Sequence, residues 1–102
     1  MVLINPKARQ DLEEIRIGLL YWEKIKLSKK FIHSYMNDII DECYSLDKKL
    51  VHFNAHYETH KQFGSKVHTY KRNANTIWYI IYNKTGENIY IEKIISNYMT
   101  VS

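Results

Sequence analysis

The sequence predicts an α+β domain in which a hairpin of two helices packs on one face of a small antiparallel sheet. Residues 76–83 are uncharged, β-branched and aromatic, which is typical of a strand covered on both faces. Residues 66–72 and 88–95 flank this strand with alternating patterns, and short turns connect all three. Because the first half of the chain has the apolar spacing of two amphipathic helices, the expected order is β-α-α-β-β-β.

The length and composition of the chain limit its organisation. A chain of 102 residues, 45% of them hydrophobic, is long enough for one core and too short for two, so residues 1–102 are expected to form a single domain. Cys43 is the only cysteine and cannot form an internal disulfide. The sequence has no signal-peptide pattern and no apolar run near the roughly 18 residues that span a membrane. We therefore expect a cytoplasmic protein without membrane contact.

The first strand and the first helix are predicted from residues 1–22. Residues 1–4 are short and apolar and predict an edge strand. Asn5 followed by Pro6 predicts a helix start, because Asn can cap free N–H groups and Pro gives up a donor that has no partner there. Gly18 indicates that the helix bends or that another backbone passes close by. The apolar face consists of Ala8, Leu12, Ile15, Leu19 and Trp22.

A second helix follows a short break. The apolar spacing lapses over residues 24–30, where Ser28 offers a new cap. The connection is so short that the two helices are expected to be antiparallel neighbours, leaving the other face of the sheet partly open. The apolar stripe of this helix consists of Ile32, Tyr35, Ile39, Cys43, Leu46 and Leu50.

Residues 51–65 predict either a functional loop or an extension of the second helix with turns. His52, His56 and His60 are spaced four apart, and on a helix they would lie on one face, as in some zinc or copper sites. The carboxylate within residues 56–60 is not where the HExxH arrangement requires it. We therefore predict no metal site and no cofactor, and the role of these histidines stays open.

Basic charge is concentrated in the second half of the chain. The formal net charge is +4, from 15 basic and 11 acidic residues. Residues 1–50 carry nine basic and eight acidic side chains, whereas residues 51–102 carry six and three, together with four of the five histidines. Such a balance is compatible with nucleic acid or with an acidic protein as partner.

Two stretches of sequence are more specific. The first helix opens with A-x-x-D-L-x-x-I over residues 8–15, and the strand Trp-Tyr-Ile-Ile-Tyr over residues 78–82 is followed by I-x-I-x-x-I over residues 89–94. Together with the order of the elements, these stretches resemble the RelE/ParE superfamily of toxins from bacterial type II toxin-antitoxin modules. The resemblance covers nearly the whole chain.

The resemblance implies a small toxin that a cognate antitoxin protein neutralises. RelE-like members cut messenger RNA on the ribosome at a basic, metal-free site on the exposed sheet face, whereas ParE-like members bind and poison DNA gyrase. RNA cleavage by the ribose 2′-OH requires a proton acceptor, a cation for the phosphorane and an acid for the leaving oxygen. We expect a ribosome-dependent messenger RNA endonuclease; a gyrase inhibitor and a non-toxic interaction module stay open as alternatives.

The resemblance also implies candidate site residues in the strand half. Arg72 has the position of the phosphate-binding arginine of the family, and His68 and Tyr98 are candidates for proton transfer. The candidate RNA-binding residues are Lys66 and Lys71.

The geometry of a regular strand places His68, Tyr70 and Arg72 on one shared face, which favours a nuclease site. One departure favours a toxin that acts by binding. Many family members have His or Arg at the end of the last strand, but here no basic residue follows Lys93.

Overall fold

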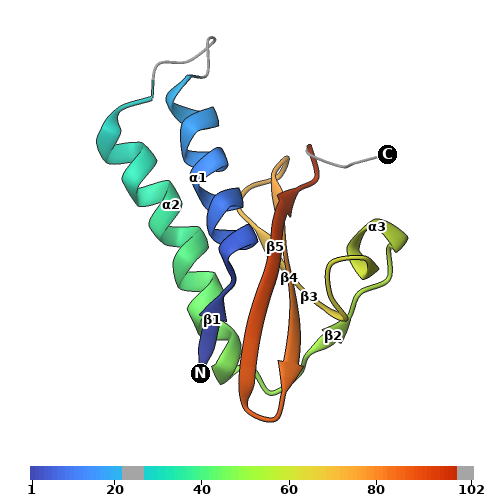
Figure 1. The fold of residues 1–102 in the computed structure, drawn as a ribbon. Coiled ribbons are helices and arrows are strands. Elements are labelled where there is room, and N and C mark those ends of the chain that lie inside the picture. Colours follow the sequence, from blue (N-terminus) through green and yellow to red (C-terminus); the bar gives the residue numbers. More distant parts are fainter. Residues whose placement is uncertain (22–26, 99–102) are drawn as a thin grey trace.

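The computed structural model describes residues 1–21 and 27–98, and it confirms the α+β fold. The helices α1 and α2 lie side by side along one face of the sheet, and the short helix α3 lies on the other side (Figure 1). The expected order of elements is present, with β2 and α3 added within residues 51–65. The elements are β1 (Val2–Ile4), α1 (Pro6–Leu20), α2 (Lys29–Tyr44), the 3₁₀ turn η1 (Ser45–Lys48), β2 (Phe53–Asn54), α3 (Glu58–Lys61), β3 (Lys66–Lys71), β4 (Ile77–Thr85) and β5 (Asn88–Ser96).

The five strands form one sheet in the order β1-β5-β4-β3-β2, so β4 lies in its centre. Strands β2 to β5 are antiparallel neighbours, whereas β1 pairs with β5 in parallel. Trp78, Ile80 and Tyr82 of β4 join the core under the helices, and Ile81 is also buried. Since successive side chains of a strand point to opposite faces, β4 is covered on both faces, as its sequence predicts.

The predicted apolar faces of the helices supply most of the core. On α1, Ala8 and Ile15 are buried, and Leu12 and Leu19 pack against the core cluster, whereas Trp22 lies outside the described residues. Helix α2 and η1 contribute the buried residues Ile32, Met36, Ile39, Cys43 and Leu46. Burial raises the pKa of the Cys43 thiol to about 12, so this thiol stays protonated at neutral pH.

The structure confirms some of the predicted helix ends and corrects others. Helix α1 begins at Pro6, but the Asn5 side chain donates to the Glu92 carboxylate instead of capping the helix. Ser28 caps α2 as predicted, because its Oγ accepts from the Phe31 N–H at 3.1 Å. Helix α2 ends at Tyr44, so the extension of its apolar stripe to Leu50 is wrong, and Leu50 is 99% exposed. Among the described residues, no backbone of another element passes close to Gly18, since nothing beyond its chain neighbours and its own helix backbone lies within 4 Å of a Cβ built there.

Asp11, the acidic residue of the A-x-x-D-L-x-x-I stretch, is a buried carboxylate of α1. Its Oδ2 accepts from the backbone N–H of Ile94 at 3.0 Å, and its Oδ1 accepts from Lys93 Nζ at 3.0 Å. Strand β1 ends opposite Ile91, so the outer edge of β5 has no strand partner beyond that point. Asp11 supplies the acceptor that a longer β1 would have supplied, which joins α1 to the sheet.

Residues 51–65 form neither a bare loop nor a helical extension. Strand β2 pairs with the first two residues of β3 and becomes the edge of the sheet, and α3 then crosses back over the second face. Gly64 permits this crossing, because a Cβ at that position would lie 2.9 Å from the Tyr82 carbonyl oxygen. Among the described residues, no helix is long and apolar enough to cross a membrane.

Candidate functional site

His68, Tyr70 and Arg72 share one face of β3 and its extension, as the alternation of a strand predicts. This face meets α2 and is not the open face of the sheet. The structure therefore corrects the expected placement of His68 and Arg72, because both side chains contact carboxylates of α2. We call this line of polar contacts the α2–β3 contact; Arg72 lies at one end of it and His68 at the other.

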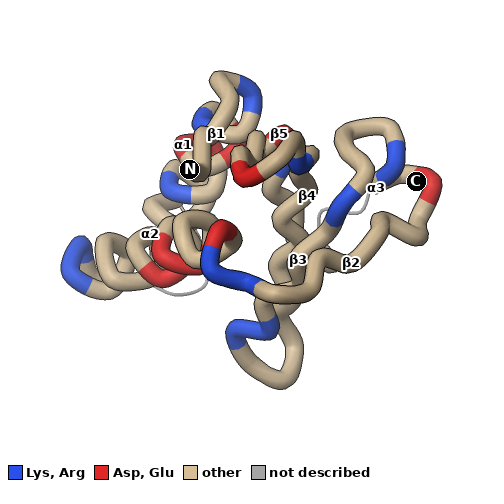
Figure 2. Tube along the Cα trace, turned by 90° about the horizontal axis from the view of Figure 1, so that it is seen from below, with Lys and Arg blue, Asp and Glu red and all other residues tan. Residues whose placement is uncertain are grey.

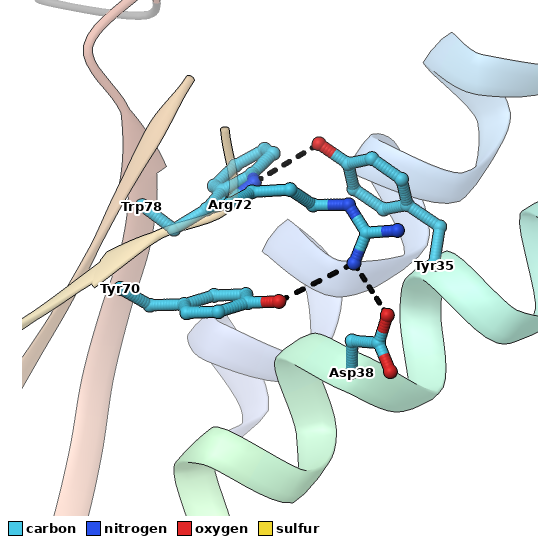
Figure 3. Close-up of polar contacts among 5 residues, drawn as sticks. All are labelled: Tyr35, Asp38, Tyr70, Arg72 and Trp78. Atoms are coloured by element: carbon cyan, nitrogen blue, oxygen red, sulfur yellow. Dashed lines mark hydrogen bonds and ion pairs between the residues drawn. The ribbon is translucent and has the colours of Figure 1, made fainter. Parts of the chain in front are cut away.

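The Arg72 end of the α2–β3 contact is closed by protein groups. Arg72 Nη1 donates to Asp38 Oδ2 at 2.5 Å and to the Tyr70 hydroxyl at 3.3 Å, as drawn in Figure 3. Its guanidinium carbon lies 4.0 Å from the centre of the Tyr35 ring, which adds a cation–π contact. The Tyr35 hydroxyl in turn accepts from Trp78 Nε1 at 3.1 Å. The arginine predicted to bind phosphate is thus already neutralised.

The pKa of Arg72 reflects the same environment. Burial has the largest single effect and lowers the pKa, but the hydrogen bonds with Asp38 and Tyr70 outweigh it and the pKa is raised. The guanidinium is therefore charged at any physiological pH, and only 18% of its side chain is exposed. A phosphate would have to displace Asp38 to reach it.

The pair at the His68 end is exposed to a similar degree as the pair at the Arg72 end. His68 Nε2 lies 2.8 Å from Glu42 Oε2, and the two side chains are 20% and 32% exposed. Because a carboxylate only accepts, a neutral imidazole in this pair carries its proton on Nε2 and keeps Nδ1 as a proton acceptor. This is the orientation that a general base requires.

His68 lines a pocket of about 400 Å³ beside η1, here called the histidine pocket. Lys48 and Lys49 line the same pocket. The remaining lining residues are Leu46, Leu50, Val51, Phe53, Val67 and Tyr82. The pocket is therefore lined by a histidine that contacts a carboxylate, by two lysines and by mostly apolar side chains.

The other predicted site residues do not join this pocket. Lys66 Nζ donates to Asn54 Oδ1 at 2.6 Å, across the β2–β3 pair. Lys71 is exposed on the opposite face of β3 from Tyr70. Tyr98 is 69% exposed just beyond β5, next to Asn97, whose side chain donates to Asn75 in the loop after Arg72. The five candidates thus occupy at least two separate surfaces.

Four charged residues of the α2–β3 contact and its pocket were not among the predicted site residues: Asp38, Glu42, Lys48 and Lys49. One signal for the acidic pair was present in the sequence. Asp38 and Glu42 are four residues apart on the predicted helix, so they lie one turn apart on one face. Figure 2 shows acidic positions along α2, and basic positions where α3 is followed by β3.

The three histidines of residues 51–65 do not share a helix. His52 precedes β2 and its Nδ1 lies 2.7 Å from the Tyr82 hydroxyl, His56 follows β2, and His60 belongs to α3. The stacked arrangement on one helical face is therefore absent. Within residues 1–21 and 27–98, no group of three or more His, Cys, Asp or Glu side chains is arranged to hold a metal ion.

The relation of this chain to known proteins was tested in three ways. Comparisons with protein-family models, with curated protein sequences and with solved structures find no match. A function is therefore inferred from the fold, the geometry of the site and the short motifs that resemble the RelE/ParE superfamily.

Proposed function

We propose that this protein is the toxin of a type II toxin-antitoxin system and that it cleaves messenger RNA on the ribosome without a metal ion. Apart from β2 and α3, the order of its helices and strands is the β-α-α-β-β-β order that accompanies the RelE/ParE resemblance. The observation that carries the proposal is the His68–Glu42 pair at the wall of the histidine pocket, beside Lys48 and Lys49. A cytoplasmic location belongs to the same proposal.

The pocket provides groups for cleavage by the ribose 2′-OH. His68 Nδ1 accepts the 2′-OH proton while that oxygen attacks the adjacent phosphorus, and the bond from phosphorus to the 5′-oxygen breaks. The ammonium groups of Lys48 and Lys49 stabilise the charge that develops on the phosphorane. The leaving 5′-oxygen takes its proton from one of these ammonium groups or from water. The products are a 2′,3′-cyclic phosphate and a free 5′-OH.

In this proposal the Arg72 contacts hold the site in place, and Arg72 does not bind the reacting phosphate. Asp38 and Tyr35 fix Arg72 at one end of the α2–β3 contact, and this fixes the strand that carries His68. Lys71 and Tyr98 are exposed on surfaces outside the pocket and are available for RNA or ribosome contact. Lys66 holds β2 against β3 through Asn54.

The proposed antitoxin contact is the apolar segment next to the pocket. Leu50, Val51 and Phe53 are 99%, 64% and 66% exposed, and all three line the histidine pocket. Consecutive exposed apolar side chains usually mark a protein interface. An antitoxin segment bound here would cover His68 and inhibit cleavage directly.

The same exposed segment favours a second candidate function, inhibition of DNA gyrase by binding. Such a toxin needs surface complementarity and no proton-transfer group. Leu50, Val51 and Phe53 would then be the contacts with the target, and His68 would have only a structural role.

The decisive experiment compares His68→Gln with the wild-type protein after induction in growing bacteria. Gln keeps a hydrogen bond to Glu42 but cannot accept the 2′-OH proton, so we expect cleavage of messenger RNA to fall by about 10²- to 10⁴-fold. His33→Gln is the matched control, because His33 is an exposed histidine on α2. Intact messenger RNA together with a DNA-damage response in cells with the wild-type protein would reject the nuclease and favour gyrase inhibition.

A further inference from the structure

A second pocket lies on the opposite side of the sheet from the α2–β3 contact. Its volume is about 240 Å³, smaller than pockets for drug-sized ligands. We call it the aromatic pocket; it is lined by His56, Tyr57, His60, Val67, Thr69 and Tyr79. Val67 also lines the histidine pocket, so the two pockets lie on either side of the edge where β2 pairs with β3.

Planar rings form the walls of the aromatic pocket. The ring of His60 lies 4.8 Å from that of Tyr79, with 48° between their planes. It lies 5.1 Å from the ring of Tyr57 at 85°. His60 thus bridges the sheet and the mouth of the pocket, where Tyr57 is 62% exposed. Rings at these angles leave aromatic faces available for a further planar group.

One buried polar atom of the pocket lacks a partner within the described part of the chain. His60 is 3% exposed, and its Nδ1 has no hydrogen-bond partner among the described residues. An orphaned polar atom at this depth costs free energy unless a ligand or water satisfies it. Burial lowers the pKa of His60, so its ring is neutral at pH 7 and offers one donor and one acceptor.

The surroundings of the pocket favour an anionic ligand. Val67 and Thr69 line it from β3, and Lys71 is the next residue on the same face, about 7 Å farther along the strand. Lys71 is exposed and forms no ion pair within the part of the chain that the structure describes. The nearest acidic residue on α3, Glu58, is paired with Lys61 at 3.3 Å. A planar group in the pocket would therefore lie close to an unneutralised cation.

We propose that the aromatic pocket binds one unstacked base of a single-stranded RNA, with Lys71 at a neighbouring phosphate. Stacking on aromatic side chains combined with hydrogen bonds to the base edge is the usual way in which proteins hold single-stranded RNA. A base offers several donors and acceptors along one planar edge, which can satisfy His60 Nδ1, whereas a Phe ring offers none and a Tyr or Trp side chain offers a single polar group. The inference rests on the proposed function, because that function makes RNA the ligand.

The test uses a tetranucleotide of 2′-O-methyl RNA, which binds but has no 2′-OH to attack the phosphate. In NMR titrations, we expect its addition to shift the His60 ring signals and the Thr69 and Val67 methyl signals. Tyr57→Ala should weaken binding by about fivefold or more, as removal of a stacking ring does. Tyr44→Ala is the matched control, because Tyr44 is an exposed tyrosine of α2.

His60→Phe separates ligand binding from packing. Phe keeps a ring between Tyr57 and Tyr79 but removes both nitrogens, so the melting temperature should not fall while affinity falls by about fivefold. Absence of shifts at millimolar RNA, or equal affinities of wild-type protein, Tyr57→Ala and His60→Phe, would overturn the proposal. Displacement of the RNA by a tryptophan-containing peptide, with tighter binding of the peptide, would overturn it in favour of a protein partner.

The same measurements distinguish this site from the proposed nuclease site. His68→Gln should abolish cleavage and leave the affinity for 2′-O-methyl RNA unchanged, because His68 does not line the aromatic pocket. If the pocket binds RNA and the wild-type protein never cleaves it, the base site stands and the nuclease assignment fails. If RNA is cleaved and no NMR signal of the aromatic pocket shifts, the base-binding proposal is wrong and the nuclease proposal is kept.

Discussion

The two ends of the α2–β3 contact have the same kinds of residues and different surroundings. At each end a basic side chain of the strand side meets a carboxylate of α2, Arg72 with Asp38 and His68 with Glu42. At the Arg72 end, Tyr35 and Tyr70 also hold the guanidinium. At the His68 end, the neighbouring groups line a pocket that is open to solvent.

This difference shows that the charge of a residue does not by itself decide whether the residue has a structural or a functional role. Arg72 has the stronger and permanent charge, but its hydrogen bonds and its ring contact are used within the fold. Among the described residues, the Glu42 carboxylate is the partner of His68, and it orients the ring at the wall of the histidine pocket. Substitutions at the two ends test whether the Arg72 contacts are structural and the His68 contact is functional.

The largest effect on stability is expected from a core residue of α2, the helix that carries both carboxylates. Ile39 is fully buried in α2 between Asp38 and Glu42, so Ile39→Ala should destabilise the protein by about 2–5 kcal/mol. Leu50→Ala is the control from the same predicted apolar stripe, and it should change stability by less than about 0.5 kcal/mol because Leu50 is exposed. Urea denaturation measures both, and similar losses would contradict the position of Leu50.

The next largest effect on stability is expected when the contacts at the Arg72 end are removed. Arg72→Ala removes the bonds to Asp38 and Tyr70 and the contact with the Tyr35 ring, and it should cost about 1–2 kcal/mol. The cost is limited because Asp38 is 45% exposed and water can solvate it. Lys71→Ala, at the exposed neighbouring position, is the control and should be nearly neutral. A stable Arg72→Ala protein that has lost all activity would instead place Arg72 in the reaction.

A smaller effect on stability is expected at the His68 end. His68→Gln should cost less than about 1 kcal/mol, because Gln still donates to Glu42 and both positions are partly exposed. Thermal denaturation beside the cleavage assay separates the two roles. Loss of stability equal to that of Arg72→Ala would make His68 a second structural contact and remove the difference between the ends.

The smallest expected effect is a pH dependence of stability caused by His60, which lies on the second face of the sheet. Because burial lowers the pKa of folded His60, the unfolded chain binds its proton more tightly. The stability associated with neutral His60 is complete above about pH 6.5 and is lost as the pH falls toward the lowered pKa of the folded state. His60→Phe should therefore lose less stability than the wild-type protein between pH 7.5 and pH 5. Parallel losses would show that His60 titrates normally.

Much of the fold was predictable because its signals are local. The β4 run, the cap at Ser28 and the spacing on α1 each depend on neighbouring residues, and the structure confirms them. The end of α2 was not predictable from spacing, since Leu46 continues the apolar stripe from η1 and hides the end of the helix at Tyr44. Strand β2 was missed because its two residues are recognisable only by their pairing with β3.

The candidate site was predictable only in part for a similar reason. Alternation along β3 placed His68, Tyr70 and Arg72 on one face, but it did not say which face α2 covers. That choice depends on the whole core, including the burial of Ile80 and Tyr82 on the same side. The buried role of Asp11 was hidden as well, because an acidic residue in the first turns of a helix is usually solvent-exposed.

The parallel pairing of β1 with β5 affects the order of folding during synthesis. Val2 lies opposite Ile89, and the Asp11 carboxylate accepts from the N–H of Ile94, so β1 and α1 are completed by a strand that is synthesised much later. Contacts this distant in sequence form slowly and after local ones. The nascent chain therefore keeps an unpaired β1 until β5 has left the ribosome. For a toxin, this delay would separate synthesis from activity and leave time for an antitoxin to bind first.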